Sequence, residues 1–119
     1  AYEIASCLVG SEICIRDRNK MKSFEHTKIA PGHFEMIDNP QNRVEQILLH
    51  HEKRSEKIIK ILNDGELTGW DVTKKLFSRP LDSMNLRLAF QETMAHLIYI
   101  ESQGKIKQKV SKVNTWKVI

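Results

Sequence analysis

Apolar residues recur at helical spacing from residue 40 onward and predict a long first helix. Asn39-Pro40 marks its start, because Asn caps a helix and Pro suits its first position. Asn63-Asp64-Gly65 marks its end, where Gly takes a left-handed conformation at low cost. The stripe that this helix is expected to bury contains Val44, Ile47, Leu48, Ile58, Ile59 and Leu62, with His51 and Ser55 in the same line.

Two shorter helices follow. Thr68 and Asp71 have the spacing of a capping box and predict a second helix that runs to about Phe77, before the break at Pro80. Asp82 or Ser83 caps a third helix, which is expected to end at Gly104. Its predicted apolar stripe contains Leu86, Ala89, Phe90, Thr93, Met94, Leu97, Ile98 and Ile100.

The pattern changes to alternation after Gly104 and predicts two β-strands, Lys105 to Val110 and Thr115 to Val118, joined by a turn. Three helices followed by a hairpin, with a short step between the second and third, is the order of a winged helix-turn-helix. A three-helix bundle with a disordered tail is the alternative, which the alternation and Trp116 disfavour. The predicted fold of residues 40–119 is thus mainly α with a small β-hairpin.

Residues 1–39 have a weaker pattern. Lys20 to Phe24 is consistent with the end of a helix, and Thr27 to Ala30 with a short strand closed by the turn signal Pro31-Gly32. No periodicity is sustained before Asn19.

Composition excludes several classes of protein. The chain has 119 residues, so it accommodates one modest core. Its apolar runs are a few residues long, far below the roughly 20 that a membrane helix requires, which predicts no membrane contact. Two cysteines cannot form a disulfide scaffold, and no signal peptide precedes the internal Met21. A cytoplasmic location is therefore expected.

The net charge of +4 comes from the C-terminal end of the chain. From residue 105 onward there are five lysines and no acidic residue: Lys105, Lys107, Lys109, Lys112 and Lys117. Such a segment is a candidate contact for a nucleic-acid backbone. The alternative, which we favour, is a solvated strand pair whose lysines discourage edge-to-edge aggregation.

Several short motifs occur in a characteristic order over residues 19–119, and together they resemble the C-terminal end of bacterial metallo-β-lactamase-fold hydrolases, similar to the β-lactamase-like protein 2 group. These relatives carry a winged-helix domain after the hydrolase. The matching motifs are Ile29-Ala-Pro-Gly-His33, His50-His51-Glu-Lys-Arg54, Leu76-Phe77 and the run from Glu92 to Ile106.

The resemblance implies that His33 is a metal ligand at the end of one of the last strands of an αββα hydrolase domain. It implies two zinc ions in the intact enzyme. The main ligand block of the family, His-x-His-x-Asp-His, is absent here, so no catalytic residue is assigned and tight zinc binding by this chain is not expected. Phe34 replaces the Gly that usually follows the ligand, which puts the usual loop conformation in doubt.

The resemblance also suggests three segments. Residues 1–18 fall outside it, and Ser11 to Arg18 looks like translated sequencing adapter, so we expect 1–18 to be non-native or disordered. Residues 19–39 are expected to be a remnant of the hydrolase domain. Residues 40–119 are expected to be the winged-helix domain.

Other polar residues favour structural roles. His51 lies in the apolar stripe of the first helix and is interpreted as a buried, hydrogen-bonded histidine. Arg54 is expected to pair with an acid on a neighbouring element. Glu92 and His96 lie one turn apart and are interpreted as a polar contact rather than an acid–base pair, because no nucleophile accompanies them. Trp70 and Trp116 are expected at the core or its edge.

Two functions from different classes remain. The first is an accessory domain that packs on the missing N-terminal hydrolase domain and helps wall its substrate cleft, in a protein that is a candidate homo-oligomer. The second is a nucleic-acid-binding winged helix that makes weak RNA or DNA backbone contact through its lysines. The third helix offers Glu92 and Glu101 against the single Arg87, a poor surface for phosphates, and this favours the accessory domain.

Overall fold

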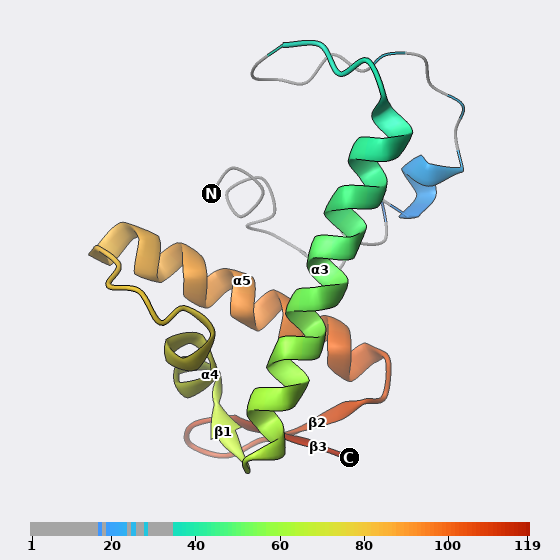
Figure 1. The fold of residues 1–119 in the computed structure, drawn as a ribbon. Coiled ribbons are helices and arrows are strands. Elements are labelled where there is room, and N and C mark those ends of the chain that lie inside the picture. The colour runs from blue at the N-terminus through green and yellow to red at the C-terminus, as the bar shows by residue number, and fades with distance from the viewer. Residues whose placement is uncertain (1–16, 18, 24, 26–27, 29–34) are drawn as a thin grey trace.

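The computed structural model describes residues 17, 19–23, 25, 28 and 35–119. From residue 35 onward, the described chain folds into helices and a small sheet (Figure 1). In chain order the elements are α3 (Pro40–Asn63), β1 (Leu67–Thr68), α4 (Gly69–Leu76), α5 (Ser83–Ser102), β2 (Ile106–Lys109) and β3 (Thr115–Val118). Residues 19–22 are also helical, in the region predicted to end a helix. The predicted strand from Thr27 to Ala30 lies outside the described residues, apart from Lys28.

Each helix begins at the cap that the sequence predicts, because a side-chain oxygen there accepts a backbone N–H that has no partner within the helix. The capping oxygens belong to Asn39, Thr68 and Asp82, and they accept from the N–H groups of Asn42 (3.1 Å), Asp71 (3.1 Å) and Asn85 (2.8 Å). The Thr68 hydroxyl also donates to the Asp71 carboxylate at 2.7 Å. The capping box is therefore confirmed.

Glycines with positive φ follow the two longer helices, as predicted. Gly65 has φ +141° and Gly104 has φ +72°. The N–H of Gly104 donates to the carbonyl of Glu101 at 2.8 Å, which satisfies one of the carbonyls left open at the end of α5.

The sheet contains one more strand than the predicted hairpin. The three strands are antiparallel in the order β1-β3-β2. β2 and β3 form the hairpin, in register from Ile106 opposite Val118 to Lys109 opposite Thr115. On the other edge of β3, Leu67 pairs with Trp116 and Thr68 with Thr115. The two-residue β1 has no alternation of its own, so only its pairing with β3 defines it.

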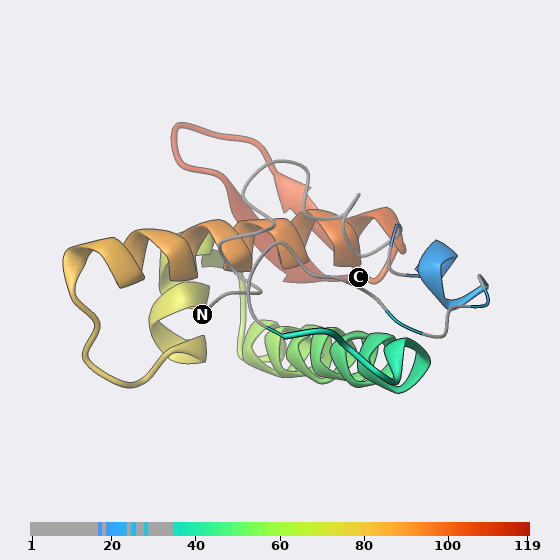
Figure 2. The same cartoon turned by 90° about the horizontal axis from the view of Figure 1, so that it is seen from above.

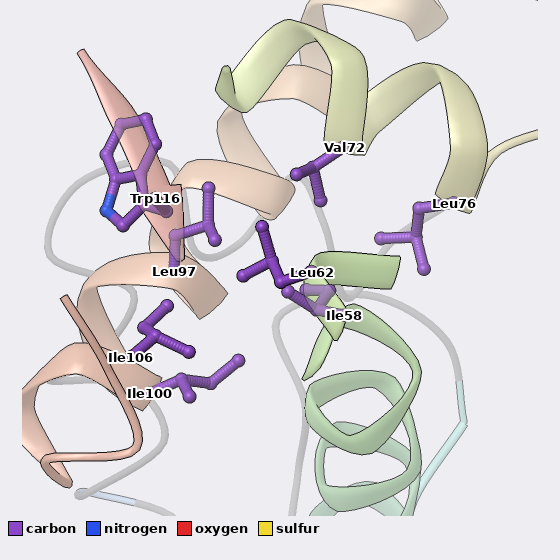
Figure 3. Packing of buried hydrophobic residues seen from close by; sticks show 8 residues of the cluster. All are labelled: Ile58, Leu62, Val72, Leu76, Leu97, Ile100, Ile106 and Trp116. Atoms are coloured by element: carbon purple, nitrogen blue, oxygen red, sulfur yellow. The ribbon is translucent and has the colours of Figure 1, made fainter. Parts of the chain in front are cut away.

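The core lies where the C-terminal half of α3, α4, α5 and the sheet meet, and α3 crosses α5 above the sheet (Figures 1 and 2). The side chains from these elements point toward one another (Figure 3). They are Ile58, Leu62, Val72, Leu76, Leu97, Ile100, Ile106 and Trp116.

The predicted stripe of α3 is confirmed, and that of α5 is confirmed except at Ile98. Ile98 was expected in the stripe of α5 but is 43% exposed, because that face of the helix has no neighbouring element over it among the described residues. Trp70, which was expected at the core or its edge, lies at the edge: it is 43% exposed, and its ring is 5.9 Å from that of Phe90. In the second helix, Val72, Leu76 and Phe77 were expected to be buried; Val72 and Leu76 are, whereas Phe77 is half-buried, since it follows the last residue of α4.

Leu97 and Ile98 give a matched test of this core, because they are neighbours on one helix with opposite exposure. Leu97 is fully buried, so Leu97→Ala is expected to lower the free energy of unfolding by about 2–5 kcal/mol. Ile98→Ala removes apolar volume from an exposed site and is expected to cost about 0.5 kcal/mol or less. Urea unfolding followed by circular dichroism measures both values, and equal losses would contradict this position of the core.

Candidate functional site

Four polar side chains form a network between α3 and α5. His51 and Arg54 come from α3, and Glu92 and His96 come from α5. Arg54 forms an ion pair with Glu92, whose side chain is only 8% exposed. The guanidinium of Arg54 also lies 5.0 Å from the centre of the Phe77 ring. The prediction that Arg54 pairs with an acid on a neighbouring element is thus confirmed.

The two buried histidines form a hydrogen-bonded chain with a defined direction. His96 Nδ1 lies 2.9 Å from the backbone carbonyl of Glu92, and a carbonyl only accepts, so Nδ1 carries the hydrogen. In the neutral ring Nε2 is then an acceptor. His51 Nδ1 lies 3.2 Å from this Nε2 and must donate to it. Both histidines therefore have the structural hydrogen bonds expected for them, and residues 92 and 96 make contact through a backbone carbonyl.

Burial dominates the electrostatics of this network. Burial lowers the pKa of His96 to about 4 against the raising effect of its hydrogen bond to the Glu92 carbonyl, while Arg54 and, least of all, His50 act in the same direction as burial. His96 is therefore neutral at pH 7. Burial also raises the pKa of Glu92, against the lowering effect of the Arg54 guanidinium. One carboxylate oxygen of Glu92 is buried without a hydrogen-bond partner in the described part of the chain.

A basic pocket of about 400 Å³ lies beside this network, between α3 and the segment that follows α4. Its cationic and histidine side chains are His50, Lys53, Arg54, Lys57 and Arg79, and its apolar wall is formed by Leu76, Phe77 and Leu81. Positions 50, 53, 54 and 57 repeat at intervals of three and four, so they share one face of α3. This spacing is the signal in the sequence that groups the four residues, and no site was predicted from it.

A second pocket, of about 250 Å³, lies on another side of α3 and has a different charge. It includes Glu52 and Glu56 together with His51 and Ser55. The Ser55 hydroxyl is buried and has no hydrogen-bond partner among the described residues. α3 therefore carries basic side chains toward one pocket and acidic side chains toward the other.

The five C-terminal lysines are all exposed, on or next to the β2–β3 hairpin. Lys107 lies directly opposite Lys117 in the sheet. Lys109 lies 3.6 Å from the carboxylate of Glu66, which also accepts a 2.6 Å hydrogen bond from the Thr115 hydroxyl. That hydrogen bond, together with the charge of Lys109, lowers the pKa of Glu66. The negative charge of Glu66 thus compensates part of the positive charge of these lysines. The sequence pattern does not show this pairing.

The predicted metal ligand His33 lies outside the described residues. Within 35–119 and the few described positions before them, no three His, Cys, Asp or Glu side chains are grouped as a metal site. The same residues contain no helix with the length and apolar character needed to cross a bilayer.

Comparison with known proteins gives a consistent picture. Residues 56–118 match the family described as "Metallo-beta-lactamase-like, C-terminal domain". The "Beta-lactamase-like protein 2 homolog" of Caenorhabditis elegans is 37% identical over 60 residues, which cover 50% of this chain and 20% of that protein. The "Probable metallo-hydrolase YqjP" of Bacillus subtilis (strain 168) is 26% identical over 91 residues, 76% of this chain and 28% of that protein.

Solved structures agree with these relatives. The metallo-β-lactamase family protein TTHA1429 from Thermus thermophilus superposes with a TM-score of 0.73 at 27% identity, over 92% of this chain and 33% of that one. A β-lactamase domain protein from Burkholderia ambifaria superposes with a TM-score of 0.82 over 94% of this chain and 34% of that one, and at 16% identity it shows the fold alone. The chain therefore spans about a third or less of the length of these relatives.

The depressed pKa of His96 predicts how stability depends on pH. Between the ordinary histidine pKa of 6.5 and the folded value of about 4, the unfolded chain binds a proton at this residue that the folded chain does not. The free energy of unfolding is therefore expected to fall as the pH drops through this window, by on the order of 3 kcal/mol. The raised pKa of Glu92 acts in the opposite direction, because the folded chain protonates that carboxyl first.

Urea unfolding between pH 7.5 and pH 4 isolates the contribution of His96. His96→Gln removes the titrating group and is expected to flatten the decline relative to the unsubstituted chain. His50→Gln removes an exposed histidine that makes the smallest contribution to lowering the pKa of His96, so it is expected to reduce the decline far less than His96→Gln does. The same pH dependence in both variants would contradict the assignment.

Proposed function

The chain belongs to the family of metallo-β-lactamase-like C-terminal domains, and from this membership we propose that it is the accessory domain of a metal-dependent hydrolase. In this proposal it packs against an N-terminal hydrolase domain and helps wall the substrate cleft. The observation that carries the proposal is the family match over residues 56–118, in a chain that covers only about a third of its solved relatives.

The order of elements supports a winged-helix architecture for residues 40–119. A long helix, a short strand, two helices and a hairpin follow one another, and the first strand joins the hairpin in one antiparallel sheet. In winged helices the third helix reads the DNA groove. Here Glu92 of α5 is committed to Arg54, and Glu101 accepts a hydrogen bond from the N–H of Gln108 at 2.8 Å. Glu92 is therefore buried and does not face a ligand as the sequence suggested, whereas Met84 and Ile98 are exposed on α5, and exposed apolar side chains suit packing against protein better than reading bases.

The proposal places the metal chemistry at the junction of the two domains. His33, which precedes α3, would contribute one zinc ligand by its match to the family motif, and the hydrolase domain would contribute the others. Zinc would supply a bound water with a pKa lowered toward neutrality.

The first experiment compares this chain with the longer polypeptide that joins it to the preceding hydrolase domain. With zinc present, the 119-residue chain is expected to cleave no ester, thioester or single-stranded RNA above the buffer rate. Removal of residues 40–119 from the longer polypeptide is expected to lower kcat/KM by about tenfold or more, because cleft walls position the substrate. Metal-dependent turnover by the isolated chain that His33→Ala abolishes would overturn the proposal, as would a truncated hydrolase with unchanged kcat/KM.

A second candidate function is weak binding of a nucleic-acid backbone, favoured by the five exposed lysines on and beside the hairpin. In this case the contact is electrostatic and carries no sequence preference. Glu66 opposes it locally through its ion pair with Lys109.

This second candidate predicts a Kd of roughly 10⁻⁴ to 10⁻⁶ M for single-stranded RNA at physiological salt. Combined Lys105→Gln, Lys107→Gln and Lys117→Gln substitutions are expected to weaken binding and to reduce its salt dependence. Lys60→Gln, Lys74→Gln and Lys75→Gln remove the same charge from α3 and α4 and serve as the control. Fluorescence anisotropy at several salt concentrations measures both, and equal loss in the two variants would exclude a hairpin-specific contact.

A further inference from the structure

The basic pocket beside α3 contains more positive charge than the described residues neutralise. Arg54 is paired with Glu92, but Lys53, Lys57 and Arg79 contact no carboxylate in the described part of the chain. Like charges gathered around a concave surface repel one another, and the repulsion weakens when an anion enters. The acidic residues nearest in sequence, Glu52 and Glu56, line the other pocket of α3.

The walls of the basic pocket are well defined. Lys53, Arg54 and Lys57 project from consecutive turns of a regular helix. Arg54 is held from two sides, by the buried carboxylate of Glu92 and by the ring of Phe77. Arg79 comes from the segment between α4 and α5 and lines the same pocket. Cations are thus arranged around one space by two separate parts of the fold.

The number of cations indicates the class of anion. Three positive charges remain after Arg54 and Glu92 compensate each other, and a single carboxylate would leave two of them unpaired. A phosphoryl group carries up to two charges and offers three terminal oxygens, which suits lysine and arginine donors on several sides. The apolar wall of Leu76, Phe77 and Leu81 provides a surface for an organic part joined to the phosphate.

We propose that the pocket between α3 and the α4–α5 connection binds a phosphoryl group through Lys53, Lys57 and Arg79. This site is separate from the hairpin lysines and involves no hydrolase residue, so it does not depend on the proposed accessory role. The bound group belongs either to a small phosphorylated molecule or to the end of a nucleic-acid strand. Both sources present the same chemistry to the pocket.

Isothermal titration of the full 119-residue chain with inorganic pyrophosphate tests the proposal. Saturable binding with one site is expected, and the double substitution Lys57→Gln and Arg79→Gln is expected to weaken it by about tenfold or more through the loss of two charged donors. The control Lys60→Gln and Lys74→Gln removes the same charge from outside both the pocket and the hairpin and is expected to change the Kd by less than about twofold. Thermal unfolding of each variant verifies that it is folded.

Two further titrations distinguish the source of the phosphate. Tighter binding of adenosine monophosphate than of pyrophosphate would show that the apolar wall contributes and would identify a small phosphorylated molecule. Binding of a short 5′-phosphorylated oligonucleotide that the pocket variant loses, with no binding of its unphosphorylated form, would identify a strand end. No binding of pyrophosphate, or equal weakening by the pocket variant and the control, would overturn the proposal.

Discussion

The buried pair of Arg54 and Glu92 fixes the crossing of α3 and α5, and the arrangement of the rest of the domain depends on that crossing. Apolar side chains such as Ile58 and Leu97 would tolerate a small sliding of one helix along the other. A carboxylate that is 8% exposed would not, because sliding would leave its charge buried and unpaired. The ion pair therefore selects one registry of the two helices, while the apolar contacts around it supply the stabilisation.

The two histidines at the same crossing form a hydrogen bond whose donor and acceptor are fixed. Because the Glu92 carbonyl only accepts, one hydrogen position at His96 determines the hydrogen position at His51, on the other helix. Two rings 5.2 Å apart between their centres are thereby held in one relative orientation. The hydrogen bonds of the histidines and the apolar packing of α3 on α5 therefore favour the same arrangement of the two helices. Such agreement is typical of a chain that has a single well-defined fold.

The helices were predictable because their signals are local. Asn39, Thr68 and Asp82 cap helices through contacts three residues away, so the sequence alone contains the whole interaction. The third strand was not predictable, because Leu67 and Thr68 become a strand only by pairing with Trp116 and Thr115, far along the chain. The exposure of Ile98 follows the same rule, since apolar spacing shows which residues share a face but not whether another element covers that face.

The polar site was likewise predictable only in part. The sequence indicated that His51, Arg54, Glu92 and His96 make structural contacts, but which side chain meets which is decided by the packing of α3 on α5. The basic pocket depends on Arg79, which reaches α3 only through the turn after α4.

In the sheet, Lys107 lies opposite Lys117, and like charges in that position weaken a strand pair by roughly 0.2–1 kcal/mol. Because Ile106 and Trp116 anchor the hairpin in the core, this repulsion weakens the pairing of β2 with β3 without separating them, and added salt should strengthen the pairing slightly by screening the two ammonium groups.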